Sequence, residues 1–236
     1  MKMSIAIPTW ECYGRGGEFL DDLLRTIEIQ TFKDFEVCIS DHSKDDNVLN
    51  VVKQFENKFK IVYFRNENNR GNGPVNTNKS IDMCSGDIIK VMFQDDFFYD
   101  DESLQKIHTS LSNSDNMWLV NGCNHTNNDG HSFYNEMYPR WNDDIINGVN
   151  TISSPSVLSI KKGVFNKVKF DTDLTMMMDC EFYYHVKKSF GDPIYYDDIL
   201  VTNRVHSEQI SQLHYGDKTH HEKMNKEVSY CIQKHK

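Results

Sequence analysis

Hydrophobic residues in the first hundred positions follow two alternating patterns. Short runs rich in β-branched and aromatic residues, such as MSIAIP at 3–8 and FEVCISD at 35–41, are typical of buried strands. Between them lie segments whose apolar residues recur every three to four positions, as in 17–31. The predicted elements are strands at 3–8, 35–41, 60–65 and 87–94, and helices at 17–31, 46–58 and 74–84. This alternation favours βαβ units and a mainly parallel central sheet flanked by helices.

The second half of the chain has a less regular pattern. Its predicted elements are a helix at 102–112, a strand at 116–123, a helix at 179–190, a strand at 194–202 and a charged helix over 216–236. The stretch 124–155 is rich in Asn, Asp, Gly and aromatic residues and has no clear period, so we expect loops and short antiparallel strands there. No linker divides the chain, and we expect one α/β domain over 1–236.

Composition and charge narrow the class of protein. With 26 basic and 35 acidic residues the chain carries a formal charge of −9, which argues against nucleic acid as a partner. No apolar run approaches the ~20 residues of a membrane helix, so we expect a soluble, cytoplasmic protein without a transmembrane segment; peripheral contact with a membrane stays open. Six dispersed cysteines without a C-x-x-C pair argue against a disulfide framework or a cysteine zinc site.

Two adjacent carboxylates, Asp95 and Asp96, end the fourth predicted strand. Adjacent carboxylates repel each other unless a cation lies close by, and Mg²⁺ or Mn²⁺ bound to phosphate oxygens meets that need. Alternatively, the pair only ends the strand and caps the helix at 102–112. Because the carboxyl ends of parallel strands meet at one edge of a sheet, we expect Thr9 and Asp41 beside the pair.

Taken in order, these strand ends are similar to the motifs of a known family. The first strand ends in Pro8-Thr9, the second in Asp41 followed by a Ser/Asp-rich turn, and the fourth in Gln94-Asp95-Asp96, a D-x-D-type motif. The set resembles the inverting, nucleotide-sugar-dependent glycosyltransferases of family 2, which have the Rossmann-like GT-A fold. The resemblance covers residues 3–210 and is tightest before residue 100.

The resemblance implies a division of labour within one GT-A domain. Residues 1–100 would bind the nucleotide sugar, 101–215 would form a small antiparallel acceptor-binding region, and 216–236 would be the charged C-terminal helix. The donor would be a nucleoside diphosphate sugar, with a UDP-sugar favoured, and the acceptor a hydroxyl of a glycan or another molecule. Mn²⁺ or Mg²⁺ would be the cofactor and would stabilise the leaving diphosphate.

The resemblance also implies roles for single residues on the donor side. The base and ribose pocket would be lined by Pro8, Thr9 and Glu11, and Asp41 would accept a hydrogen bond from the base. The segment that crosses the phosphates and the sugar would contribute Arg70, Gly71, and Asn76 or Asn78. The choice between the two asparagines stays open, because the family's usual Ala-Arg-Asn is replaced here by Val-Asn-Thr-Asn, one residue longer.

The metal site implied by the resemblance departs from the usual motif in one position. Asp96 matches the residue that binds the cation, and Asp95 would face the ribose or the donor sugar. The first carboxylate is replaced by Gln94, so a further ligand is needed. His206, after the last predicted strand, is the candidate; the alternative is a histidine in a surface loop.

An inverting transfer is a single displacement at the anomeric carbon, and it also needs a general base that takes the proton of the acceptor hydroxyl. The run Met178-Asp179-Cys180-Glu181 opens a predicted helix and resembles the family's Glu-Asp motif, with Asp179 at the catalytic position. Glu181 is the second candidate for the base. The alternative for Asp179 is a helix N-cap.

Two other functions remain open at this point. A nucleotidyltransferase acting on a sugar-1-phosphate would also use paired carboxylates, but it needs a glycine-rich basic loop, of which Gly14-Arg15-Gly16-Gly17 is only a partial match. A non-catalytic nucleotide- or sugar-binding module is favoured if the substitution by Gln94 has weakened the metal site.

Overall fold

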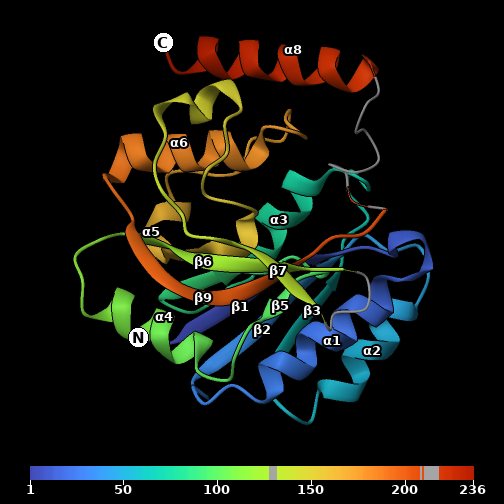
Figure 1. Cartoon of the computed structure of the whole chain (residues 1–236). Coiled ribbons are helices and arrows are strands. Elements are labelled where there is room, and N and C mark those ends of the chain that lie inside the picture. Colours follow the sequence, from blue (N-terminus) through green and yellow to red (C-terminus); the bar gives the residue numbers. More distant parts are fainter. Residues whose placement is uncertain (128–131, 208, 210–217) are drawn as a thin grey trace.

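The computed structural model describes residues 1–127, 132–207, 209 and 218–236. Its N-terminal half confirms the predicted parallel α/β unit (Figure 1). The parallel strands are β1 (Met3–Thr9), β2 (Phe35–Asp41), β3 (Ile61–Arg65) and β4 (Ile88–Val91), in the order β3-β2-β1-β4. Ala6 of β1 pairs with Cys38 on one side and Val91 on the other. Because β2 and β3 lie on one side of β1 and β4 on the other, a topological switch point lies between β1 and β4.

Three helices connect these strands. They are α1 (Gly16–Glu28), α2 (Asn47–Phe55) and α3 (Gly73–Asp82). Right-handed crossovers place α1 and α2 on one face of the sheet and α3 on the other, because the chain reverses its direction across the sheet after β3 (Figure 1). The predicted apolar face of α1 is buried and comprises Phe19, Leu20, Leu23, Leu24 and Ile27.

The sheet continues beyond β4 in mainly antiparallel pairing. The further strands are β5 (Phe97–Phe98), β6 (Trp118–Thr126), β7 (Phe133–Met137), β8 (Leu158–Lys161) and β9 (Ile194–Arg204). β8 is antiparallel to both β4 and β6, β9 is parallel to β6, and β5 and β7 form antiparallel edges on β9 and β6. β7 confirms the expected short strand within 124–155. β8 escaped prediction, because four residues are too few to reveal a period.

The fourth strand is shorter than predicted, and the difference shapes the site. The ladder of β4 ends at Val91, although Met92 N still donates to Ala6 O at 3.0 Å. The next amide, Phe93 N, turns to the side-chain Oγ of Ser156 at 2.9 Å. The chain therefore leaves the sheet before Asp95 and Asp96, so both residues lie beyond the end of β4.

The remaining elements complete the two outer layers. They are α4 (Ser103–Ser112), α5 (Lys162–Phe165), α6 (Met178–Phe190) and α8 (Lys218–Lys234), with short 3-10 turns η1 (Cys12–Gly14), η2 (Asp143–Asn147) and η3 (Pro155–Val157). Figure 1 shows α8 lying across the outer side of α6, remote from the sheet. α8 confirms the predicted C-terminal helix from Lys218 onward; its predicted residues 216 and 217 lie outside the described residues.

Candidate active site

A polar cavity of about 320 Å³ opens beside the switch point. Asp95 and Asp96 line it from the segment after β4, and Ser154 and Asn203 line it from the antiparallel half. The cavity thus joins the two halves of the sheet at the edge where open α/β sheets bind ligands.

Asp95 and His206 form a pair of candidate metal ligands in which the carboxylate is partly exposed and the imidazole is buried. Nε2 of His206 lies 3.1 Å from Oδ2 of Asp95, whose side chain is 20% exposed. His206 itself is buried, with its ring 4.8 Å from the ring of Phe19 in α1. The fold therefore brings His206, more than a hundred residues away in sequence, to the carboxylate pair.

Asp96 is held more tightly than Asp95. It is buried, and its carboxylate accepts from the backbone N of Arg204 at 3.0 Å and from Oγ of Ser154 at 3.4 Å. Burial, with the neighbouring charge of Asp95, raises the pKa of Asp96 to about 8. A cation beside Asp95 and Asp96 would favour the ionised form of Asp96, because a positive charge offsets both the burial and the repulsion from Asp95.

Gln94, the residue in place of the first D-x-D carboxylate, has a structural role. Its Oε1 accepts from the backbone N of Trp10 at 2.7 Å, and its Nε2 donates to the backbone O of Trp10 at 3.0 Å. A carboxylate could accept the first bond but could not donate the second. The amide therefore ties the segment after β1 to the segment after β4, on either side of the switch point.

Asp41 lies at the end of β2 and is fully buried. Its carboxylate accepts from Ser43 N at 2.8 Å and from the hydroxyl of Tyr63 at 2.7 Å, and Nε of Arg65 is 3.3 Å away. Desolvation and this hydrogen bond raise the pKa of Tyr63 well above its usual range, which keeps the hydroxyl a donor. In this conformation Asp41 organises the end of β2, and its contact with a base stays a prediction.

The two alternative asparagines of α3 are both engaged with backbone. Asn76 is buried; its Nδ2 donates to Thr9 O at 2.9 Å, and its Oδ1 accepts from Ser40 Oγ at 2.7 Å. Asn78 pairs with the backbone of Phe170, donating to its O at 2.8 Å and accepting from its N at 3.0 Å. Asn76 thus lies at the ends of β1 and β2, whereas Asn78 anchors α3 to the second half of the chain.

The other predicted donor-side residues lie on the loops around the same strand ends. Thr9 is buried, and Glu11 accepts from the backbone N of Lys44 at 3.3 Å, which joins the loops after β1 and β2. Arg70 is paired with Glu67 at 3.3 Å in the loop before α3. Two further predicted residues, Pro8 at the end of β1 and Gly71 with φ of 88°, complete this rim.

Asp179 opens α6 on the side of the antiparallel half. Its Oδ2 accepts from Nδ2 of Asn150 at 2.7 Å, and its Oδ1 accepts from the backbone N of Cys180 at 2.7 Å. The same Asn150 Nδ2 donates to the backbone O of Ser153, a residue that lines the cavity in a left-handed conformation with φ of 104°. Asp179 is therefore connected to the cavity through Asn150, and burial raises its pKa.

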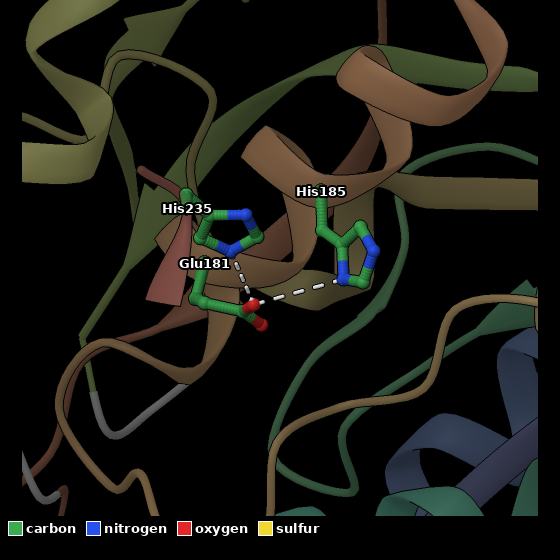
Figure 2. Close-up of side chains that lie close together, drawn as sticks. All are labelled: Glu181, His185 and His235. Atoms are coloured by element: carbon green, nitrogen blue, oxygen red, sulfur yellow. Dashed lines mark hydrogen bonds and ion pairs between the residues drawn. The ribbon is translucent and has the colours of Figure 1, made fainter. Parts of the chain in front are cut away.

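Glu181, the second candidate for the base, lies apart from Asp179. It is fully buried, and its Oε1 lies 2.7 Å from Nε2 of His235, which follows the end of α8 (Figure 2). The same oxygen lies 2.9 Å from Nζ of Lys234, the last residue of α8. Consecutive helical residues are rotated by about 100°, so residues two apart point to nearly opposite sides. Asp179 and Glu181 therefore cannot serve one site.

Sequence reasoning missed a buried lysine behind the carboxylate pair. Lys90 of β4 is fully buried, and its Nζ donates to Oδ1 of Asn121 at 3.2 Å and to the backbone O of Ser156. Burial lowers the pKa of Lys90 to about 7, although the charge of Asp96 acts in the opposite direction. The detectable signal was a single charge inside the otherwise apolar run IIKVMF.

The strand order and the carboxylate pair at the switch point define an α/β protein of the GT-A class. The model of the family described as "Glycosyl transferase family 2" matches residues 4–185, well over half of the chain. The chain therefore belongs to glycosyl transferase family 2, as the motifs predicted.

Among curated proteins, the chain is 31% identical over 96 residues to the GalNAc(5)-diNAcBac-PP-undecaprenol beta-1,3-glucosyltransferase of Campylobacter jejuni. The match covers 40% of this chain and 30% of the relative, so the chain spans under a third of that protein.

Solved structures share the fold at low sequence identity. The S. aureus TarS fragment 1–349 in complex with UDP has a TM-score of 0.71 at 18% identity, over 98% of this chain and 65% of that one. The Pyrobaculum calidifontis mannosyltransferase PcManGT, in complex with GDP-Man and Mn²⁺, has a TM-score of 0.69 at 12% identity, over 94% of this chain and 62% of that one. No helix within the described residues is long and apolar enough to span a bilayer.

Proposed function

We propose that this chain transfers a sugar from a nucleoside diphosphate, a UDP-sugar in the first instance, to a hydroxyl of a glycan acceptor with inversion at the anomeric carbon. The observation that carries the proposal is the cavity at the switch point. It is lined by Asp95 and Asp96 and connected through Asn150 to a further carboxylate, Asp179. Family membership, and the UDP in the complex of TarS, support the choice of donor.

The candidate metal site has a donor set that suits Mn²⁺ or Mg²⁺. Asp95 and Asp96 supply the carboxylate oxygens that suit Mn²⁺ and Mg²⁺, and His206 adds an imidazole nitrogen. Two adjacent carboxylates beside the cavity, one of them buried, are the observation that favours a cation here, because a nearby positive charge would offset both the burial of Asp96 and its repulsion from Asp95. A bound cation would act as a Lewis acid on the diphosphate. These three residues would hold it.

Asp179 is the proposed general base. The acceptor hydroxyl gives its proton to the carboxylate of Asp179 while its oxygen forms a bond to the anomeric carbon. The bond from that carbon to the diphosphate oxygen breaks with its electron pair, and the nucleoside diphosphate leaves. Asn150 orients the base, because it donates to Oδ2 of Asp179 and is itself fixed by the backbone of residues 152 and 153. The raised pKa of Asp179 improves it as a proton acceptor once it is ionised.

The proposed acceptor is a glycan, in keeping with the Campylobacter relative, whose name describes a glycan on PP-undecaprenol. The antiparallel half would bind it, as the sequence predicts for residues 101–215. An acceptor carried on a lipid would bring the enzyme to a membrane surface. In that case the cytoplasmic protein would act at the periphery of the bilayer.

A donor panel assayed by release of nucleoside diphosphate tests this function. We expect release from one donor with Mn²⁺, none with EDTA, and a loss of about a hundredfold in Asp96→Ala, the scale of removing one transition-state contact. Asp101→Ala, which removes an exposed carboxylate five residues away, is the matched control and should keep full activity. Release of pyrophosphate from a sugar-1-phosphate and nucleoside triphosphate would indicate a nucleotidyltransferase. UDP binding without turnover over the whole panel would indicate a binding module.

A further inference from the structure

A second cluster of potential metal ligands lies far from the cavity, between α6 and α8. Glu181 and His185 stand one turn apart on α6, and His235 follows the end of α8 (Figure 2). One ligand atom from each of the three residues lies within 4.8 Å of the others. The carboxylate reaches both rings, at 2.7 Å from Nε2 of His235 and 3.7 Å from Nδ1 of His185.

Two polar atoms of this cluster have unused bonding capacity. Oε2 of Glu181 and Nδ1 of His185 are both buried and have no hydrogen-bond partner among the described residues. Burying a polar atom without a partner is unfavourable, so such atoms call for an explanation in a native fold. Glu181 is fully buried, yet His185 keeps a third of its side chain exposed, which leaves an entry path from solvent.

We propose that Glu181, His185 and His235 bind a transition-metal ion, with Zn²⁺ as the best fit. Two imidazoles and one glutamate are an established three-residue set for Zn²⁺, and water can supply the fourth ligand. The ligands of one Zn²⁺ lie about 2.0–2.2 Å from the ion and hence within about 4.4 Å of one another. The cluster therefore needs only small side-chain rotations to close around it.

A lysine competes for the same carboxylate. Nζ of Lys234 lies 2.9 Å from Oε1 of Glu181 and 2.6 Å from Oδ2 of Asp171. An incoming cation would release Lys234 from Glu181, while its ion pair with Asp171 would keep the ammonium neutralised. The metal would thus replace one contact between α6 and α8 with a coordinate link, and it would fix α8 on the helix that carries Asp179.

Zn²⁺ titration calorimetry on the EDTA-treated full chain tests the site. Working with both the wild-type chain and Asp96→Ala separates this site from the cavity at the switch point. We expect one Zn²⁺ per chain to persist in Asp96→Ala, and His185→Ala or His235→Ala to weaken it at least tenfold, or about 1.4 kcal/mol. His108→Ala, which removes a half-buried helical histidine of α4, is the matched control and should bind like its parent.

A variant that should bind Zn²⁺ more tightly provides an independent test. Lys234→Met removes a competing charge, and relief of about 1 kcal/mol of repulsion in a solvent-like dielectric corresponds to a gain of about fivefold. Because His185 is partly exposed, its variant should fold even if the His235 variant does not, and circular dichroism checks this. Equal Zn²⁺ affinity in the parent and His185→Ala would overturn the proposal and leave the cluster as an ion-pair contact of α8.

Discussion

Glu227 on α8 makes a contact whose loss should be large and easy to measure. It is buried, and its Oε2 accepts from three consecutive backbone amides before α6, those of Thr175 at 3.0 Å, Met176 at 2.7 Å and Met177 at 2.9 Å. A carboxylate at this position pairs the N–H of the N-cap Met177 and the two amides before it, and it interacts favourably with the helix dipole. The contact therefore fixes the N-terminus of α6, where Asp179 lies.

The cost of changing Glu227 follows from these three bonds. A hydrogen bond to a charged group contributes about 1.5–3 kcal/mol and a neutral one about 0.5–1.5 kcal/mol, so Glu227→Gln loses about 1 kcal/mol per bond. Three bonds to one oxygen do not add fully, and we expect about 1.5–2 kcal/mol in total. Glu227→Ala leaves the amides without an acceptor, and we expect about 3 kcal/mol.

Thermal unfolding followed by circular dichroism measures this effect. For a chain of this size, 1 kcal/mol changes Tm by about 2–4 °C, so Glu227→Gln should lower Tm by about 3–8 °C and Glu227→Ala by more. Glu222→Gln changes an exposed glutamate on the same helix and should stay within about 0.5 kcal/mol of wild type. If both Glu227 variants have the same Tm as Glu222→Gln, the hydrogen bonds from Glu227 to the start of α6 contribute nothing to stability and the reasoning is wrong.

Three further outcomes are expected from the site. Asp179→Asn should lower kcat by about 10²–10⁴-fold in the transfer assay while the circular dichroism spectrum stays that of wild type. Burial raises the pKa of Asp179, and the base must be ionised to act. The acid limb of the wild-type kcat/KM profile should therefore lie at higher pH than the pKa of an ordinary aspartate. An acid limb at or below the pKa of an ordinary aspartate contradicts the assignment. Gln94→Glu should destabilise the fold by about 1–3 kcal/mol in urea unfolding, because the new carboxylate cannot donate to Trp10 O. The same variant should not bind the metal more tightly than wild type. Tighter Mn²⁺ binding would show that position 94 can serve the metal.

Much of the fold could be predicted from the sequence, because burial imposes a period on it. The strands and helices of the first hundred residues follow the alternation of apolar runs and helical spacing, and their carboxyl ends share one edge of the sheet. For the same reason the strand pattern alone was enough to place the carboxylate pair Asp95 and Asp96 at that edge. β8 lay beyond this reasoning, since four residues carry no period and its partners β4 and β6 are distant in sequence.

Only the tertiary structure decided which partner each polar side chain found. Gln94 reads as a weakened metal ligand in the sequence, yet it bonds to the backbone of Trp10, more than eighty residues away. His206 was a candidate by resemblance alone, and the fold set it 3.1 Å from Asp95.

Asp179 and Glu181 are only two residues apart in the chain, but in α6 Asp179 is bonded to Asn150 whereas Glu181 contacts Lys234 at the end of α8. The spacing of apolar residues indicates which side of a helix or strand is buried, because residues near one another in the chain determine that side. The partner on that buried side depends on residues far away in the sequence, and it exists only once the chain has folded.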